Sequence, residues 1–185
     1  MIEKKYGIIG KPLSHSLSPL LHNFWYKKHN IKASYSLIEI DAIQIEETID
    51  KIRSKKLQGI NVTTPHKQAV IPFLDLVIND AKKTSSVNTI YLNNENKIVG
   101  DNTDVYGFDY SFIKILKEKE SSRKNIMILG AGGVTPSIIL ALAKKKFKKI
   151  FISNRTVEKA KLIAKKFPFV EIILWENIDN KAQDI

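Results

Sequence analysis

Apolar residues recur along the chain with two alternating periods, which predicts a protein built from strands and helices in turn. Short apolar runs bounded by glycine or polar residues predict strands. Longer stretches with apolar residues three and four positions apart predict helices, the first beginning at Ser18-Pro19. The predicted strands are 6–10, 33–40, 58–62, 87–92, 97–99, 125–129, 149–153 and 170–174, and the predicted helices are 18–29, 45–55, 69–74, 105–116, 134–146 and 157–167.

Strands that alternate with helices favour parallel pairing, because a parallel connection needs a crossover segment. The sequence therefore predicts an α/β protein. Its first part is an α/β domain with a mostly parallel sheet, and its second is an incomplete Rossmann-type domain in which the pattern βαβαβ begins near residue 125. We place the boundary at the head of the helix that follows Asp104.

Composition narrows the possible chemistry. The chain has 185 residues, 43% of them hydrophobic, and no cysteine, so disulfides and thiolate metal sites are excluded. Its four histidines fall at no metal-ligand spacing, and we expect no metal. No apolar run approaches the roughly 20 residues that span a bilayer, and the first residues lack the apolar core of a signal peptide. These features predict a cytoplasmic protein with no membrane partner.

Charge raises a further possibility, since 30 Lys+Arg against 19 Asp+Glu give a net charge of +11. Such an excess suits nucleic acid, anionic substrates or a lysine-rich surface. The lysines lie along predicted amphipathic helices and are not clustered with aromatic residues as in single-strand binders. We therefore expect solvated helix faces and no nucleic-acid partner.

A glycine-rich turn, Gly130-Ala131-Gly132-Gly133, directly follows a predicted strand and opens a helix. In this context, glycines let backbone amides approach a pyrophosphate at the helix N-terminus. Thr135 stands where the dinucleotide fingerprint has its third glycine. The alternative is a tight glycine turn that binds no ligand.

The end of the next predicted strand bears on which dinucleotide binds. A site that prefers NAD usually carries an acid there for the ribose 2′-hydroxyl. This chain has Asn154-Arg155-Thr156, with Lys159 one turn on, and these groups suit a 2′-phosphate. The sequence thus predicts NADP, against the alternative that Thr156 caps a helix beside solvated basic residues.

Polar side chains also follow the predicted strands of the first part, where ligands of open α/β sheets bind. Each of them has an alternative reading as a turn or cap residue, and Ser18 in particular has a sufficient role as a helix N-cap. Together they are expected to line one cleft that faces the glycine-rich turn. The candidates are Ser16, Ser18, Asn61, Thr63, Lys67, Asn88 and Asp104.

These residues belong to six ordered motifs through which the chain resembles shikimate dehydrogenase. The resemblance implies NADP-dependent interconversion of 3-dehydroshikimate and shikimate, in aromatic amino acid biosynthesis through chorismate. It implies catalysis by Lys67 and Asp104, substrate binding by Ser16, Ser18, Asn61, Thr63 and Asn88, and cofactor binding by Gly130, Ala131, Gly132, Gly133, Asn154, Arg155, Thr156 and Lys159. The motifs are His-Ser-x-Ser-Pro (15–19), Asn-Val-Thr-x-Pro-x-Lys (61–67), Val-Asn-Thr (87–89), Asn-Thr-Asp (102–104), Gly-Ala-Gly-Gly (130–133) and Asn-Arg-Thr (154–156).

The resemblance also implies the domains: a substrate-binding (catalytic) domain over 1–104, a linking helix over 105–122 and a partial NADP-binding Rossmann domain over 123–185. The family continues beyond this length, so a fragment or a truncated form is expected. Two alternatives stay open, an NAD-using quinate/shikimate dehydrogenase and a non-catalytic, truncated shikimate-binding paralogue. The expected partner is the small-molecule substrate, and the protein is expected to be a monomer or homodimer.

Overall fold

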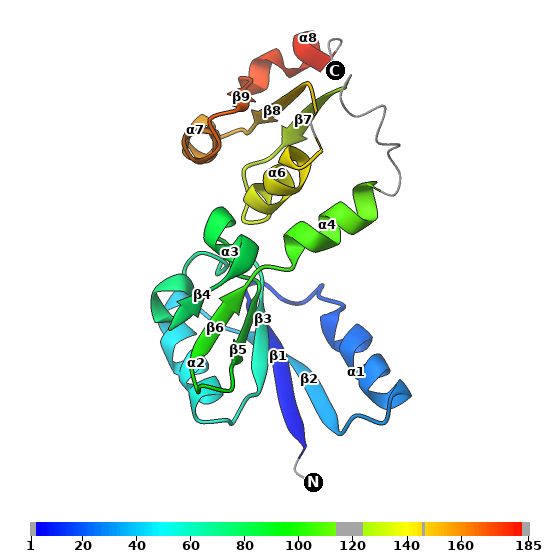
Figure 1. Cartoon of the computed structure of the whole chain (residues 1–185), viewed down its shortest axis with the longest axis vertical. Helices are drawn as coiled ribbons and strands as arrows, with labels where there is room; N and C mark the ends of the chain where they lie inside the picture. The colour runs from blue at the N-terminus through cyan, green and yellow to red at the C-terminus, as the bar shows by residue number, and fades with distance from the viewer. Residues whose placement is uncertain (1–2, 114–123, 146, 183–185) are drawn as a thin grey trace. The chain divides into compact units, whose positions relative to one another are not determined.

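The computed structural model describes residues 3–113, 124–145 and 147–182. The chain divides into two compact units, Met1–Thr103 and Asp104–Ile185. Each unit combines its own sheet with helices, as Figure 1 shows. The predicted α/β class is therefore confirmed, and the two units are described separately.

The first unit contains six described strands: β1 (Lys4–Gly10), β2 (Ala33–Glu39), β3 (Gly59–Val62), β4 (Leu76–Val77), β5 (Thr89–Leu92) and β6 (Ile98–Asp101). They form one sheet in the order β2-β1-β3-β5-β6-β4. Three of the five neighbouring pairs are parallel, and β5 runs antiparallel to both β3 and β6. The antiparallel pairing of β5 with β6 follows from the short turn at Asn93–Asn96 that joins them.

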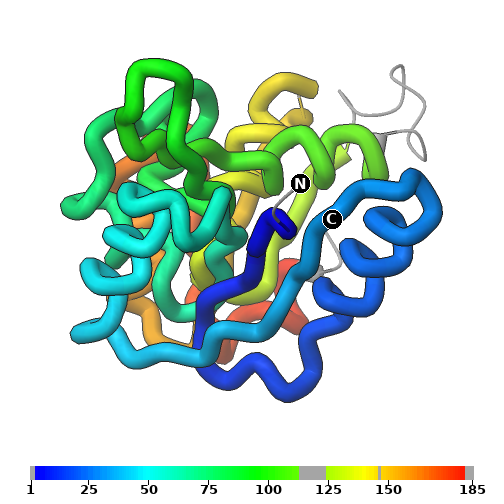
Figure 2. Tube along the Cα trace, turned by 90° about the horizontal axis from the view of Figure 1, so that it is seen from below, coloured from blue at the N-terminus to red at the C-terminus, as the bar shows by residue number. Residues whose placement is uncertain are grey.

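The helical segments of this unit are α1 (Ser18–Lys28), η1 (Ala42–Gln44), α2 (Ile45–Arg53), η2 (Ile71–Phe73) and α3 (Asn79–Thr84). Helices α1 and α2 lie on opposite faces of the sheet (Figures 1 and 2). Alternation along β1 explains this, because Ile8 packs with Tyr35 on the α1 side and Ile9 packs in the α2 cluster. The sequence analysis differs from the structure in two details: the helix predicted at 69–74 is the single 3₁₀ turn η2, and α3 was not predicted.

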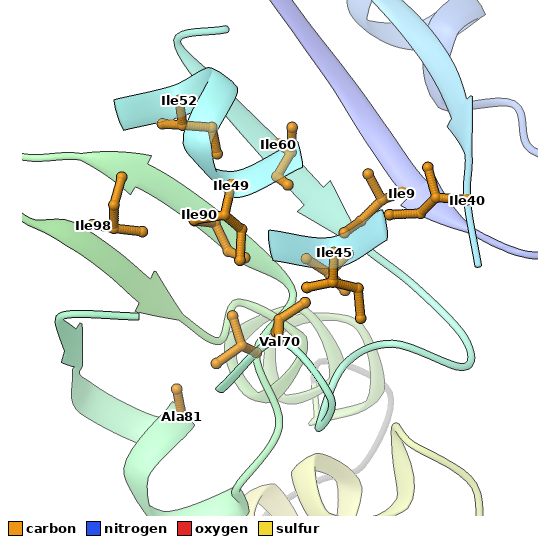
Figure 3. Packing of buried hydrophobic residues seen from close by; sticks show 12 residues of the cluster. Ile9, Ile40, Ile45, Ile49, Ile52, Ile60, Val70, Ala81, Ile90 and Ile98 are labelled. Atoms are coloured by element: carbon orange, nitrogen blue, oxygen red, sulfur yellow. The ribbon is translucent and has the colours of Figure 1, made fainter. Parts of the chain in front are cut away.

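The main core of the first unit lies between α2 and the sheet, where Figure 3 shows isoleucine side chains from both converging. Ile45, Ile49 and Ile52 recur at helical spacing on α2, and each is at most 1% exposed. They pack against Ile60 of β3 and Ile90 of β5. This core fixes the positions of the strands, and the ends of these strands carry the candidate site.

The second unit contains the parallel strands β7 (Asn125–Leu129), β8 (Lys149–Ser153) and β9 (Val170–Ile172). Its helical segments are α4 (Asp104–Ile113), α6 (Thr135–Ala143), α7 (Val157–Lys166), η3 (Trp175–Asn177) and α8 (Ile178–Ala182). Residues 114–122 of the predicted linking helix lie outside the described residues. Across the ranges that are described, no helix has the length and apolar character needed to cross a membrane.

Candidate active site

The segment that carries Lys67 leaves the carboxyl end of β3 and is fastened at several points. The backbone N–H of Thr63 donates to the carbonyl of Ile9 at 2.9 Å, which extends the pairing of β3 with β1. His66 is 3% exposed, and its Nε2 lies 2.9 Å from the carbonyl oxygen of Ile40. Lys67 therefore stands on a backbone anchored to two neighbouring parts of the sheet.

Asn88 lies at the same edge of the sheet, although the strand that it precedes runs in the opposite direction. It directly precedes β5, and the antiparallel course of β5 places its start beside the end of β3. The N–H of Val62 donates to the Asn88 carbonyl at 2.8 Å, and the N–H of Val87 donates to the Lys67 carbonyl at 2.8 Å. The expectation that all candidates follow parallel strands was thus wrong for Asn88, although the residue still reaches the predicted edge.

The side chains of Asn61 and Asn88 are both held by hydrogen bonds. Asn61 Oδ1 accepts from the Tyr35 hydroxyl at 2.7 Å, and its Nδ2 donates to the Asn88 carbonyl at 3.2 Å. Asn88 is 8% exposed, and its Nδ2 donates to Thr103 Oγ1 at 2.9 Å while its Oδ1 accepts from the Thr103 N–H at 3.0 Å. The structure therefore brings Asn61, Thr63, Lys67 and Asn88 together within the first unit.

The loop that carries the two serines is ordered by a carboxylate from β2. Glu39 Oε2 accepts from the Leu13 N–H at 3.0 Å, and the Leu13 carbonyl accepts from the Ser16 N–H at 2.9 Å. Leu17, not Ser18, occupies the N-cap position of α1 and makes no side-chain capping bond, while Ser16 Oγ accepts from the Ser18 N–H at 3.4 Å. The prediction that Ser18 is the N-cap was therefore wrong, so capping does not account for its hydroxyl.

Lys11 ties the start of the serine loop to the Lys67 segment. Its backbone N–H donates to the Thr64 carbonyl at 3.1 Å. Its ammonium lies 2.8 Å from Asp41 Oδ1, and this hydrogen bond raises the pKa of Lys11. The serine loop and the end of β3 are consequently held beside each other.

Asp104 opens α4 and belongs to the second unit. An acidic side chain in the first turn of a helix is stabilised by the positive end of the helix dipole. The catalytic role that the resemblance implies for Asp104, together with Lys67 of the first unit, stays a prediction.

The glycine-rich turn of the second unit is stabilised by a threonine. Gly130 has φ of 113°, which an L side chain rarely adopts, and the space beside it is open. Thr135, 3% exposed, accepts from the Gly132 N–H at 3.0 Å and donates through Oγ1 to the Gly130 carbonyl at 3.0 Å. The residue in the third-glycine position therefore secures the turn from within.

The Asn-Arg-Thr segment is joined to this turn by Asn154. Its Oδ1 accepts from the Ala131 N–H at 3.0 Å, and its Nδ2 donates to the Thr156 carbonyl at 2.7 Å. Thr156 is the N-cap residue of α7, without a side-chain capping bond. Arg155 and Lys159 are exposed at the same end of β8.

These two cations and the open space at Gly130 fit the predicted NADP site, with Arg155 and Lys159 for the 2′-phosphate. The only carboxylate in 154–159 is Glu158, in the first turn of α7, where the helix dipole accounts for it. Within the ranges described, no group of three His, Cys, Asp or Glu side chains is placed to hold a metal ion.

Sequence reasoning missed four residues that build these sites. Tyr35 and Glu39 lie on β2, Thr103 lies inside the Asn-Thr-Asp motif, and Thr135 was considered only as a substituted glycine. A signal existed for Thr103, because it stands between two residues of a motif. None existed for Glu39, whose contact with Leu13 joins residues 26 positions apart.

Comparison with known proteins gives two family matches. Residues 8–90 match the shikimate dehydrogenase substrate binding domain, and residues 114–184 match shikimate / quinate 5-dehydrogenase. A protein of Pelagibacter ubique named shikimate dehydrogenase (NADP(+)) is 49% identical over 179 residues, which cover 96% of this chain and 66% of that protein. Across curated relatives of this kind, the matched part spans between 56% and 66% of the relative's length.

Solved structures agree with these matches. The crystal structure of shikimate dehydrogenase from Aquifex aeolicus has a TM-score of 0.85 and 39% identity, and the match covers 97% of this chain and 68% of that one. The enzyme of Listeria monocytogenes, crystallised with shikimate and NAD, has a TM-score of 0.81 and 26% identity, covering 98% and 64%. This chain therefore belongs to the shikimate dehydrogenase family.

Proposed function

We propose that the protein carrying this chain is an NADP-dependent shikimate dehydrogenase, which reversibly reduces 3-dehydroshikimate to shikimate. The observation that supports this best is the convergence of Asn61, Thr63, Lys67 and Asn88 at one edge of the first unit's sheet. The names of the relatives support the choice of reaction. In this proposal residues 1–104 bind substrate, 105–122 link the domains and 123–185 form part of the cofactor domain.

Reduction of a ketone needs a proton at the oxygen and stabilisation of the charge that develops there. The Lys67 ammonium has both capacities, acting as acid in reduction and as base in the reverse direction. Asp104 would orient that ammonium and bind a substrate hydroxyl. The hydroxyls of Ser16, Ser18 and Thr63 and the amides of Asn61 and Asn88 would hold the carboxylate and ring hydroxyls, which fixes the face of the ring that reacts.

NADPH supplies the hydride when it is bound. The chain's own contribution is the turn at Gly130–Gly133. The N–H groups of Ala131 and Gly132 donate to Asn154 and Thr135, and these hydrogen bonds fix the shape of the turn. Arg155, Thr156 and Lys159 would bind the adenosine 2′-phosphate, since a guanidinium, a hydroxyl and an ammonium all donate hydrogen bonds to phosphate.

Two measurements test the proposal. Calorimetry with shikimate and, separately, with NADP⁺ is expected to show that each binds the protein. Lys67→Ala is expected to lower kcat by about 10²- to 10⁴-fold, the usual contribution of general acid catalysis, with a much smaller change in KM. Lys82→Ala, which removes an exposed lysine from α3 in the same unit, serves as the control. Normal turnover of Lys67→Ala would contradict the assignment.

Two alternatives are separated by the same ligands. An NAD-using quinate/shikimate dehydrogenase would turn over NADH as well as NADPH, and the Listeria complex with NAD makes this comparison worthwhile. A non-catalytic shikimate-binding protein would bind shikimate and show no turnover. We also propose a cytoplasmic monomer or homodimer that has no nucleic-acid or membrane partner, which sedimentation and a salt-dependent DNA-binding assay would check.

A further inference from the structure

Tyr35 occupies an unusually constrained position on β2, the edge strand of the first sheet. An edge strand leaves backbone groups without a strand partner. At Tyr35 the carboxamide of Asn23 replaces that partner, because its Oδ1 accepts from the Tyr35 N–H at 2.9 Å and its Nδ2 donates to the Tyr35 carbonyl at 2.9 Å. The Tyr35 ring is 5% exposed and stacks on His22, with centroids 4.1 Å apart and planes inclined by 5°. Backbone and ring are thus both held from α1.

The Tyr35 hydroxyl begins a chain of hydrogen bonds that leads through Asn61, Thr89 and Asn88 to Thr103. It donates to Asn61 Oδ1 at 2.7 Å, and Asn61 Nδ2 donates to Thr89 Oγ1 at 3.3 Å. Thr89 Oγ1 donates to Asn88 Oδ1 at 3.0 Å, and Asn88 Nδ2 donates to Thr103 Oγ1 at 2.9 Å. Burial raises the pKa of the Tyr35 hydroxyl, so the group keeps the proton that it donates to Asn61.

Donor and acceptor atoms determine how each carboxamide is turned. Asn61 has one acceptor atom and one donor atom, and the Tyr35 hydroxyl, which can donate or accept, here donates to the oxygen. The nitrogen is then left to face the Asn88 carbonyl and Thr89. Thr89 in turn gives its only proton to Asn88 Oδ1, which also accepts from the Thr103 N–H, and these two donors together leave the Asn88 nitrogen to face Thr103 Oγ1. The Asn61 amide is consequently occupied by partners within the protein.

From this geometry we propose that Tyr35 is a positioning residue of the substrate site, acting through Asn61 and Thr89 to stabilise the orientation in which the Thr103 N–H also holds the Asn88 carboxamide. The inference rests on the proposed function in taking Asn88 as a substrate ligand. It also changes the proposed role of Asn61. In this inference Asn61 orients Asn88 and does not contact the substrate through its own amide. The inference also extends the site to a strand whose residues none of the six motifs includes.

Tyr35→Phe tests the proposal, since it removes one hydroxyl and keeps the stacked ring. The matched control is Tyr26→Phe. Tyr26 lies near the same His22, at a centroid distance of 6.1 Å, and within the described residues its hydroxyl makes no hydrogen bond. Both rings line one groove of about 260 Å³, so Tyr26→Phe removes a hydroxyl from the same groove without removing a hydrogen bond to Asn61.

The first readout needs no ligand: the side-chain amide resonances of Asn61 and Asn88 in ¹H–¹⁵N spectra. Tyr35→Phe is expected to shift both pairs of resonances, and Tyr26→Phe to leave them unchanged. A shift at Asn61 without one at Asn88 would overturn the proposal that Tyr35 acts on Asn88 through Asn61. Unchanged resonances at both residues would overturn it as well.

The second readout is shikimate affinity. Loss of one buried hydrogen bond is expected to weaken binding by about three- to tenfold in Tyr35→Phe, and not in Tyr26→Phe. In an Asn61→Ala background, the same substitution should have no further effect, because its route to Asn88 is already broken. Additive effects of the two substitutions would overturn the proposal. If the wild-type chain binds no shikimate, the proposed function fails, and the amide resonances alone decide whether Tyr35 orients Asn88.

Discussion

Discrimination between NADP and NAD is predicted to depend on two exposed cations at the end of β8. Arg155 and Lys159 lie at the N-terminus of α7, where the Lys159 N–H donates to the Thr156 carbonyl at 3.2 Å. A hydrogen bond to a charged group contributes about 1.5–3 kcal/mol, and exposure to water and salt reduces this to about 1–2 kcal/mol for each cation. Arg155→Ala and Lys159→Ala should therefore each weaken binding of a 2′-phosphate by about 5- to 30-fold.

Calorimetry with 2′,5′-ADP, and with 5′-AMP for comparison, measures this effect without the nicotinamide half of the cofactor. Lys161→Ala is the control, because it removes the same charge from an exposed position on α7, turned about 200° away from Lys159. We expect affinity for 2′,5′-ADP to fall in the two test variants only, and the loss to shrink as salt increases. Equal losses in Lys161→Ala, or equal losses for 5′-AMP, would refute a specific 2′-phosphate site.

Three further outcomes follow from the contacts described. Ile49→Ala, at a position 1% exposed in the first core, should destabilise that unit by about 2–5 kcal/mol in native-state hydrogen exchange, whereas Ile43→Ala at 90% exposure should change it little. Ser153→Ala should leave stability unchanged or raise it, because the buried Ser153 hydroxyl has no hydrogen-bond partner among the residues that the structure describes; a clear loss in thermal unfolding would contradict this. Burial lowers the pKa of His22 below 6.5, so the unfolded chain binds the proton more readily and the stability of the first unit should fall as pH drops below that value. His22→Phe should flatten this pH dependence in urea unfolding, and an unchanged profile would exclude His22 as its source.

The hydrophobic pattern was sufficient for most of the architecture. Long helices such as α1 and α2, and buried strands such as β7 and β8, were predicted because each has many residues that repeat one period. Short elements were missed or misjudged. Residues 79–84 form α3 although they contain few apolar positions, and Ser18 lies inside α1 instead of capping it. A few residues carry too little periodicity to distinguish a turn of helix from a loop, and tertiary contacts decide between them.

The sequence by itself determined the family, the order of the two units and the chemical groups that the site offers, because motifs and hydrophobic periodicity are local properties of the chain. Only the tertiary structure decided how those groups are held. The reversed direction of β5 brings Asn88 beside the end of β3, Glu39 orders a loop 26 positions away, and Tyr35 reaches Asn61 across the width of β1. Such contacts join residues far apart in sequence, and their donors and acceptors become partners only when the strands are paired in register.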